Sequence, residues 1–383
     1  MLIQAQQLNN STIELPLSKS VANRAIILSK LYGTPQAQAQ LHSQLSGTVL
    51  SDDIRVMLRL TDRLHIDTDF TVEASGTAMR FGTALLAVTP GTRTITGTQR
   101  LCQRPIAPLV DALRQLGADI QYLGEEGFPP LRITGKQPMK GGPLTIRGDI
   151  SSQFISALLM IAPTFQQPLQ LTIEGEAVSQ PYVEMTRRMV SQRAWDTIEP
   201  DWSAAAFWYE ISVLSGIDFQ LPGLRADSVQ GDRVCHDIFE QIRRNTDLHC
   251  FCYDFTDCPD LVQAVVVTCC MKHIPFHFTG LQTLRIKETD RIAALQNEMA
   301  KLGIEIHATD SEMWSDSISR LASTAVDAID AIDTYNDHRM AMAFAPCAIT
   351  LGSIRINDPE VVTKSYPTYW DDLKKAGFEI CSI

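Results

Sequence analysis

The sequence predicts a two-domain protein of the α/β or α+β class. Three observations support this prediction. The chain has 383 residues, enough for two domains that each bury a core. Stretches that alternate apolar and polar residues are interleaved throughout with apolar runs of helical period. Six helix-like segments also begin in a similar way, which indicates repeated units.

Each of the six segments opens with polar residues that suit an anion and then becomes apolar. In chain order they are SKSVANRAIIL (18–28), SGTAMRFGTALL (75–86), SSQFISALLMIA (151–162), GDRVCHDIFEQI (231–242), KETDRIAALQNEM (287–299) and NDHRMAMAFA (336–345). The openings recur at loosely regular intervals of 58, 75, 80, 56 and 50 residues, counted between Lys19, Thr77, Ser152, Asp232, Glu288 and His338. Strand-like stretches lie between them, such as PLQLTIEG (168–175) and GSIRIND (352–358). The sequence therefore predicts six helices with strands between them.

The polar openings have two explanations. A Ser, Thr, Asp or Asn before an apolar helix is usually an N-cap, and this explains Asp149, Ser151 and Asp232. Capping does not explain cations near a helix N-terminus, where the macrodipole disfavours positive charge. Four of the openings carry such a cation: Arg24, Arg80, Arg291 and Arg339. We infer that several helix N-termini and basic side chains bind one anionic ligand.

The composition limits the class of partner and the compartment. The net charge of −11 argues against nucleic acid or an anionic membrane surface as a general partner. The N-terminus, MLIQAQQLNN, lacks the features of a secretory signal, and the longest apolar run, 261–271, is too short to cross a bilayer. Nine cysteines in a chain of this size favour reduced thiols and a cytoplasmic location.

One group of residues has the composition of a metal site. His249, Cys250, Cys252 and Cys258 follow the spacing H-C-x-C-x5-C, which matches no usual zinc pattern. The segment LHCFCYDF alternates like a strand, which places Cys250 and Cys252 on one face. We therefore expect free thiols here and no metal.

Eight motifs in order along the chain resemble the enolpyruvyl transferase family, in particular its branch that acts on shikimate-3-phosphate. They are LPLSKSVANR, SGTAMRF, QRPIAPLVDALRQLGA, SSQFISALLM, VSQPYVEM, LRIKETDR, YNDHRMAM and VTKSYPTYW. The motifs extend over nearly the whole chain. KETDR or NDHRMAM alone is moderately specific, but the full series is very specific.

The resemblance implies a particular fold. The family has two domains that form an inside-out α/β barrel, each built from three βαβαββ repeats, with the active site in the cleft between them. The first domain is discontinuous in this family. A stretch rich in Pro, Gly and Asp at 221–232 predicts a boundary between the two domains. We therefore expect one domain from 1–17 plus 231–383 and an inserted domain from 18–230.

The resemblance also implies the reaction. The enolpyruvyl group of phosphoenolpyruvate is transferred to the 5-hydroxyl of shikimate-3-phosphate, and phosphate is released. Such an enzyme serves aromatic amino-acid biosynthesis, needs no cofactor or metal, and binds no nucleic acid or membrane. We expect a monomer whose partners are these two small-molecule substrates.

The resemblance also implies which residues form the site, because the family's site residues match positions in these motifs. Shikimate-3-phosphate would be bound by Lys19, Ser20, Arg24, Ser151, Ser152, Gln153, Ser179, Tyr182, Asp260 and Lys287. Phosphoenolpyruvate would be bound by Lys19, Gly76, Arg104, Gln153, Arg291, His338, Arg339 and Lys364. The catalytic residues would be Asp260, as base for the hydroxyl, and Glu288 and Lys19, as candidates that deliver the proton to the methylene carbon.

Two alternatives remain from the sequence. The sister enzyme that uses UDP-N-acetylglucosamine carries a reactive cysteine five residues before the arginine that corresponds to Arg104; here that position is Gln99, and Cys102 is out of place. A non-catalytic anion-binding relative on the same fold is the second alternative. This chain departs from the usual pattern at Leu17 and has Ala74-Ser75 in place of a common Asn-Ala pair, although the charged positions are kept.

Overall fold

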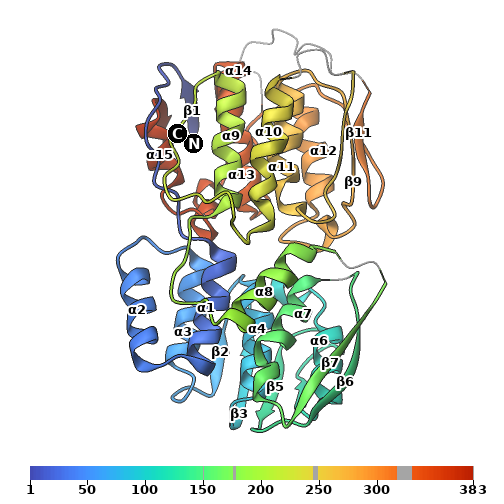
Figure 1. Cartoon of the computed structure of the whole chain (residues 1–383). Coiled ribbons are helices and arrows are strands. Elements are labelled where there is room, and N and C mark those ends of the chain that lie inside the picture. Colours follow the sequence, from blue (N-terminus) through green and yellow to red (C-terminus); the bar gives the residue numbers. More distant parts are fainter. Residues whose placement is uncertain (150, 176–177, 245–248, 317–329, 383) are drawn as a thin grey trace. The chain divides into compact units, whose positions relative to one another are not determined.

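Residue contacts divide the protein into two compact units, which are described separately. The computed structural model describes residues 1–149, 151–175, 178–244, 249–316 and 330–382 (Figure 1). The inserted unit is Leu17–Glu199, and the terminal unit combines Met1–Pro16 with Pro200–Ile383. Within the described ranges, no helix is both long and apolar enough to cross a membrane.

The inserted unit contains helices on two sheets. Its helices are α1 (Lys19–Tyr32), α2 (Pro35–Ser46), α3 (Asp52–Asp62), α4 (Gly76–Ala87), α5 (Gln99–Cys102), α6 (Ala107–Gln115), α7 (Ser152–Ile161), the 3-10 turn η1 (Ala162–Thr164) and α8 (Gln180–Gln192). Its strands are β2 (Asp69–Thr71), β3 (Gly91–Thr96), β4 (Asp119–Tyr122), β5 (Leu131–Gly135), β6 (Gly141–Arg147) and β7 (Gln167–Glu174).

The terminal unit also contains two sheets. Its helices are α9 (Trp202–Ser215), α10 (Cys235–Arg244), α11 (Val262–Met271), α12 (Arg291–Lys301), α13 (His338–Phe344), α14 (Ala348–Leu351) and α15 (Tyr369–Lys375), with 3-10 turns η2 (Gly231–Val234), η3 (Pro259–Leu261), η4 (Leu284–Ile286), η6 (Ala345–Cys347) and η7 (Pro359–Lys364). Its strands are β1 (Leu2–Ala5), β8 (Phe251–Asp254), β9 (Phe276–Thr279), β10 (His307–Ala308), β11 (Met313–Ser315), β12 (Ser353–Arg355) and β13 (Phe378–Cys381).

One topology occurs in both units. In the inserted unit, the strand order β2-β3-β5-β4 combines a parallel β2–β3 pair with antiparallel β3–β5 and β5–β4 pairs. In the terminal unit, β8-β9-β11-β10 has the same order and the same directions. The parallel pair is crossed over by α4 in one case and by α11 in the other. The described residues therefore contain two complete βαβαββ units.

The remaining sheets are smaller. Strands β6 and β7 pair in parallel around α7, so this segment has the first half of the same unit. In the terminal unit, β1 lies between β12 and β13 and is antiparallel to both, which joins the two ends of the chain in one sheet. The prediction of a fold that mixes helices and strands is confirmed.

All six predicted helix openings begin a helix. They correspond to α1, α4, α7, η2 with α10, α12 and α13. The strand-like stretches are also found, as β7 and β12. Every residue of α4 and of α11 is buried. This explains why these two central helices show no amphipathic period: each is covered on all faces.

The return to the terminal unit differs from the expected position. We expected it at residue 231, but the terminal unit resumes at Pro200. The reason is α9, which packs on α10 and α11 and buries Phe207 and Trp208 in the core of the terminal unit (Figure 1). The Pro-, Gly- and Asp-rich stretch 221–232 is therefore a connection within the terminal unit.

Glu210 of α9 is a carboxyl group in the apolar core. Its side chain is completely buried, and neither carboxylate oxygen has a hydrogen-bond partner among the described residues. Burial raises the pKa of Glu210 well above its usual range. The folded protein therefore holds a proton here that the unfolded chain releases above about pH 4.3, so this group makes stability fall as pH rises.

Glu210→Met is expected to stabilise the protein by about 1–3 kcal/mol at neutral pH, because it removes an unpaired polar group from the core. Urea unfolding of the full chain between pH 5 and 8 measures this, and the variant should lose part of the decline in stability with pH. The matched control is Glu305→Met, at a side chain that is 84% exposed, which should shift stability by about 0.5 kcal/mol or less. A less stable Glu210→Met protein with an unchanged pH slope would contradict this assignment.

Candidate active site

Helix beginnings position the charged residues of the terminal unit. Asp290 caps α12 by accepting a hydrogen bond from Ala293 N at 3.1 Å, and Arg291 is the first residue of that helix. Asp337 caps α13 by accepting from Arg339 N at 2.9 Å. Asp260 lies in η3, directly before α11, and Lys364 is the last residue of η7. Local capping therefore holds charged side chains at the starts of α12 and α13, and the turn η3 places Asp260 directly before α11.

Arg291 is the centre of this group. Its side chain is 2% exposed and contacts three carboxylates. Nη1 lies 2.8 Å from Asp260 Oδ1, Nη2 lies 3.0 Å from Glu288 Oε2, and Nε lies 2.7 Å from Asp337 Oδ2. Burial alone would lower the pKa of Arg291, but Asp337, Glu288 and Asp260 raise it. The guanidinium is thus a permanent buried cation.

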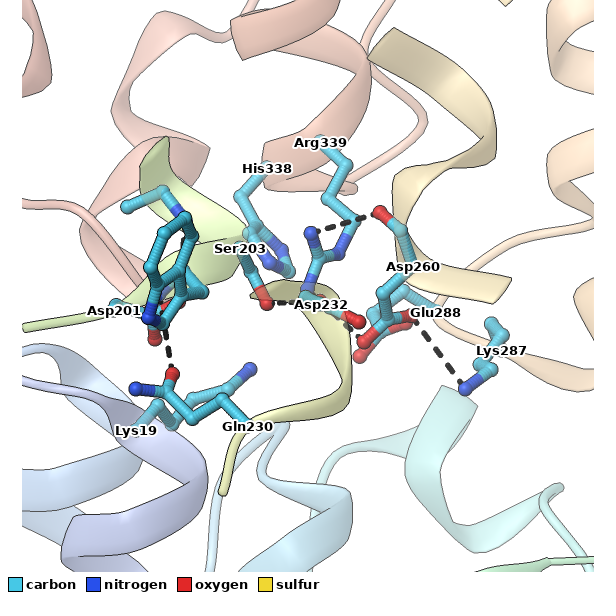
Figure 2. Close-up of polar contacts among 12 residues, drawn as sticks. Lys19, Asp201, Ser203, Gln230, Asp232, Asp260, Lys287, Glu288, His338 and Arg339 are labelled. Carbon is cyan, nitrogen blue, oxygen red and sulfur yellow. Dashed lines mark hydrogen bonds and ion pairs between the residues drawn. The ribbon is translucent and has the colours of Figure 1, made fainter. Parts of the chain in front are cut away.

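Asp260 contacts three cations in turn, of which Lys287 and Arg339 are labelled in Figure 2. Besides Arg291, Arg339 Nη2 lies 3.0 Å from Asp260 Oδ2, and Lys287 Nζ lies 3.6 Å from Oδ1. Burial raises the pKa of Asp260, but Arg339, Lys287 and Arg291 outweigh it and hold the pKa well below the usual range. Asp260 is therefore ionised at any physiological pH and can accept hydrogen bonds.

Glu288 links Arg291 to a lysine. Its Oε1 lies 3.0 Å from Lys364 Nζ, and its Oε2 lies 3.0 Å from Arg291 Nη2. His338, the first residue of α13, is almost completely buried, and its Nδ1 lies 3.6 Å from Asp337 Oδ1. In Figure 2 the side chains of Asp260, Glu288, Arg339 and His338 gather in one region of the terminal unit. The seven predicted residues of this unit thus form one charged cluster with Asp337.

Lys19 stands at the start of α1 in the inserted unit. Ser18 caps this helix through a hydrogen bond from Val21 N at 3.4 Å. Lys19 Nζ lies 3.1 Å from Oδ2 of Asp53, a buried residue in the first turn of α3. A carboxylate at this distance compensates a cation that the helix dipole disfavours.

Arg24, one turn further along α1, is 3% exposed and donates hydrogen bonds to uncharged acceptors. Nε donates to Thr186 Oγ1 at 2.7 Å, and Nη2 donates to Ser156 Oγ at 3.1 Å and to Tyr182 O at 3.2 Å. Nη1 donates to Ser20 O at 2.9 Å. Burial lowers the pKa of Arg24 to about 10, against a rise from Tyr182. Arg24 therefore ties α1 to α7 and α8, and no carboxylate of the described residues pairs with it.

Three of the four predicted serines lie at the N-termini of α7 and α8, and the fourth, Ser20, is the second residue of α1. Ser151 caps α7 by accepting from Gln153 N at 3.3 Å, and Ser152 is the first residue of this helix. Gln153 Nε2 donates to Thr77 Oγ1 at 3.2 Å, which joins α7 to α4. Ser179 precedes α8 with a left-handed φ of 55°, an uncommon conformation for a residue other than glycine. Helix N-termini with hydroxyls are suited to anions.

Gly76 begins α4 beside two arginines. A Cβ atom at this position would lie 2.8 Å from Nη1 of Arg104 and 2.8 Å from Nη1 of Arg80. The missing side chain therefore lets both guanidinium groups approach the backbone closely. Ser75, which replaces the usual Ala of the family's Asn-Ala pair, caps α4 through a hydrogen bond from Ala78 N at 3.2 Å.

Sequence reasoning missed several residues that support these groups. Asp53 pairs with Lys19 although it lies far from it in the sequence, and Asp337, in the motif YNDHRMAM, pairs with Arg291. Around the start of α9, Ser203 Oγ donates to Asp232, and Gln230 Oε1 accepts from Trp202 N at 3.1 Å (Figure 2). The first-turn carboxylates of α3 were a visible signal for Asp53, but nothing in the sequence paired it with Lys19.

The cysteine-rich segment does not form a closed metal site. Among the described residues, no three His, Cys, Asp or Glu side chains are grouped so that they could hold a metal ion. Cys258 is buried. Cys252 in β8 and Cys250, directly before this strand, are both exposed. The strand alternation predicted for this segment is confirmed, since Phe251 between the two cysteines is buried.

Comparisons with known proteins agree with the motifs. Residues 67–196 and 191–373 match the family model of EPSP synthase (3-phosphoshikimate 1-carboxyvinyltransferase). A 3-phosphoshikimate 1-carboxyvinyltransferase of Bacteroides fragilis is 43% identical over 99% of this chain and 98% of its own length. A protein of the same name from Cellvibrio japonicus is 34% identical over 94% of this chain and 95% of its own.

A solved structure shares the fold. EPSP synthase from Acinetobacter baumannii superposes with a TM-score of 0.70 at 20% identity, covering 100% of this chain and 99% of that one. The family model spans more than half of the chain, and the sequence relatives span nearly all of it. The chain belongs to the EPSP synthase family of 3-phosphoshikimate 1-carboxyvinyltransferases.

Proposed function

We propose that this protein transfers the enolpyruvyl group of phosphoenolpyruvate to the 5-hydroxyl of shikimate-3-phosphate and releases phosphate. The observation that carries the proposal is the buried cluster in which Arg291 contacts Asp260 and Glu288 while Arg339 and Lys364 contact the same two carboxylates. Two carboxylates held by several cations can handle protons while the cations bind a phosphorylated carboxylate.

The proposed roles in the terminal unit follow from these contacts. Arg291, Arg339, Lys364 and His338 would bind phosphoenolpyruvate, because arginine presents paired donors to carboxylate and phosphate groups. Asp260 would accept the hydroxyl proton as the oxygen attacks C2 of phosphoenolpyruvate, with Lys287 beside the hydroxyl. Because Asp260 is a weak base, its first contribution would be to orient the hydroxyl by a hydrogen bond.

A second proton must be added to the methylene carbon of phosphoenolpyruvate. Glu288 or Lys19 would deliver this proton, and the product of the addition is a tetrahedral adduct. Removal of a proton from the new methyl group, with departure of phosphate, then restores the enolpyruvyl double bond. The protein supplies acid, base and compensating charge, and the phosphate serves as the leaving group. The step balances without a metal or a redox cofactor.

In the inserted unit, we assign Ser20, Arg24, Ser151, Ser152, Gln153, Ser179 and Tyr182 with Lys19 to shikimate-3-phosphate, and Gly76, Arg104, Gln153 and Lys19 to phosphoenolpyruvate. The hydroxyl-bearing N-termini of α7 and α8 support the first assignment. The approach of Arg104 to Gly76 supports the second. Arg24 would act partly by fixing α1 against α7 and α8.

We also propose that the fold is an inside-out α/β barrel with three βαβαββ repeats in each unit. Two complete repeats and the first half of a third support this proposal. The six helix openings, which all begin helices, have the number and order that this arrangement requires.

The test is release of inorganic phosphate by the full chain. We expect release that requires both phosphoenolpyruvate and shikimate-3-phosphate. Controls omit each substrate, and one replaces shikimate-3-phosphate by UDP-N-acetylglucosamine. Release only with the sugar would move the chain to the sister activity, and tight binding of shikimate-3-phosphate without release would identify a non-catalytic relative.

Gly76→Ala is expected to raise KM for phosphoenolpyruvate and to weaken inhibition by glyphosate, which occupies the phosphoenolpyruvate position in the family. The added methyl group would lie 2.8 Å from the guanidinium nitrogens of Arg104 and Arg80, so both side chains must shift. We expect at least a tenfold rise in the glyphosate concentration for half inhibition. The control is Gly47→Ala, where a Cβ meets only ordinary contacts at 3.7 Å. Unchanged inhibition in Gly76→Ala would mean that this loop is wrongly aligned with the family.

A further inference from the structure

Cys250 and Cys252 form a pair of exposed thiols that the proposed reaction does not use. Their Sγ atoms are 3.8 Å apart. Phe251 between them is buried, because successive residues of an extended strand point to opposite faces. The two thiols therefore lie side by side on the solvent face.

The pair lies at the edge of a sheet. Strand β8 is the terminal strand in the order β10-β11-β9-β8, so no strand of the described residues pairs with one side of it. On the other side, the register partner of Cys252 is His277 in β9. The imidazole Nε2 of His277 lies 2.9 Å from Glu312 Oε2, so this side chain is already engaged. A ligand of the thiols can thus approach from solvent.

We propose that Cys250 and Cys252 form a chelating site for a thiophilic divalent cation of the zinc type. Two sulfur ligands of a tetrahedral zinc ion, each about 2.3 Å from the metal, lie about 3.8 Å from each other. The observed separation of 3.8 Å equals this tetrahedral edge, so both thiols can bind one ion without a change of the strand. Water fills the other two positions, because the described residues offer no third ligand in this group.

Binding changes no oxidation state. Two S–H bonds break, two metal–sulfur bonds form, and two protons pass to solvent. The site differs from the four-residue pattern considered from the sequence, because Cys258 is buried and takes no part. It is independent of the transferase activity, whose proposed residues are all elsewhere in the chain.

The experiment titrates the reduced, metal-free full chain with Cd²⁺ and follows the ultraviolet absorption of cadmium bound to thiolate. We expect one tight equivalent per chain, release of two protons, and displacement by Zn²⁺. Cys250→Ser and Cys252→Ser should each weaken binding at least thirtyfold, because one thiolate cannot chelate. The matched control is Cys381→Ser, which removes an exposed cysteine of another sheet and should leave binding unchanged.

Two results would overturn the proposal. One is tight binding that survives in Cys250→Ser or Cys252→Ser. The other is equal binding of Cd²⁺ by the native chain and by the double variant that carries both Cys250→Ser and Cys252→Ser. Both substituted side chains are exposed, so all variants should fold, and an unchanged melting temperature and phosphate-release rate would verify that they do.

Discussion

Arg291→Met is expected to destabilise the terminal unit by about 3–5 kcal/mol and to abolish phosphate release. The substitution removes a cation that is 2% exposed and lies within 3.0 Å of Asp260, Glu288 and Asp337. Asp260 keeps Arg339 and Lys287, and Glu288 keeps Lys364, but Asp337 loses a 2.7 Å partner inside the protein. Four of the five tryptophans belong to the terminal unit, so urea unfolding followed by their fluorescence measures the loss.

The matched control is Arg285→Met. Arg285 also contacts two carboxylates, Asp290 at 2.8 Å and Asp310 at 3.0 Å, but its side chain is 33% exposed. Such a surface pair contributes about 0–1 kcal/mol. An equal and small loss in the free energy of unfolding of Arg291→Met and Arg285→Met would contradict the prediction. It would mean that the buried contacts of Arg291 stabilise the protein no more than the surface contacts of Arg285.

The loss in Arg291→Met should also depend on pH. Arg291 is one of three cations that depress the pKa of Asp260. A depressed carboxyl pKa contributes stability that is present above the unfolded pKa, about 3.9 for Asp, and that is lost as pH falls through the folded pKa. Arg291→Met lacks part of the stability that ionised Asp260 contributes. The difference in the free energy of unfolding between the native protein and Arg291→Met should therefore become smaller below about pH 4.

Local signals made the helices predictable. Ser18, Ser75, Ser151, Asp290 and Asp337 are all N-caps, and a capping residue before an apolar run is a short-range pattern that the chain carries in its sequence. The same holds for β8, where alternation alone placed Cys250 and Cys252 on one face. Four arginines near helix starts were noticeable because the helix dipole disfavours cations there: Arg24, Arg80, Arg291 and Arg339.

Long-range pairing was not predictable in this way. Lys19 of α1 pairs with Asp53 of α3. Arg24 donates hydrogen bonds to acceptors in α7 and α8 that lie more than 130 residues away in the sequence. The return to the terminal unit was also misplaced, because α9 is apolar on nearly all sides and its sequence does not specify which core covers it. Burial of a helix is decided by its neighbours, which a local pattern does not contain.

Glu288→Gln is expected to lower turnover at least a hundredfold while KM for both substrates stays within a few fold. The amide has nearly the shape of the carboxyl, so it can still contact Lys364 or Arg291, which lie 3.0 Å from the two oxygens of Glu288. It cannot carry the proton that the methylene carbon must gain. Loss of one negative charge beside an anion site does not weaken binding of phosphoenolpyruvate. A hundredfold loss corresponds to about 2.7 kcal/mol of transition-state stabilisation.

Asp290→Asn is the matched control, because it also removes a carboxylate, two residues away. Asp290 caps α12 and pairs with Arg285 at 2.8 Å, and asparagine is an equally good cap. Its turnover should stay within a few fold of the native value. Steady-state rates of phosphate release separate the two variants, and single-turnover rates show whether the chemical step is slowed. Near-native turnover in Glu288→Gln would remove Glu288 from proton delivery and leave Lys19, held by Asp53 at 3.1 Å, as the group that protonates the carbon.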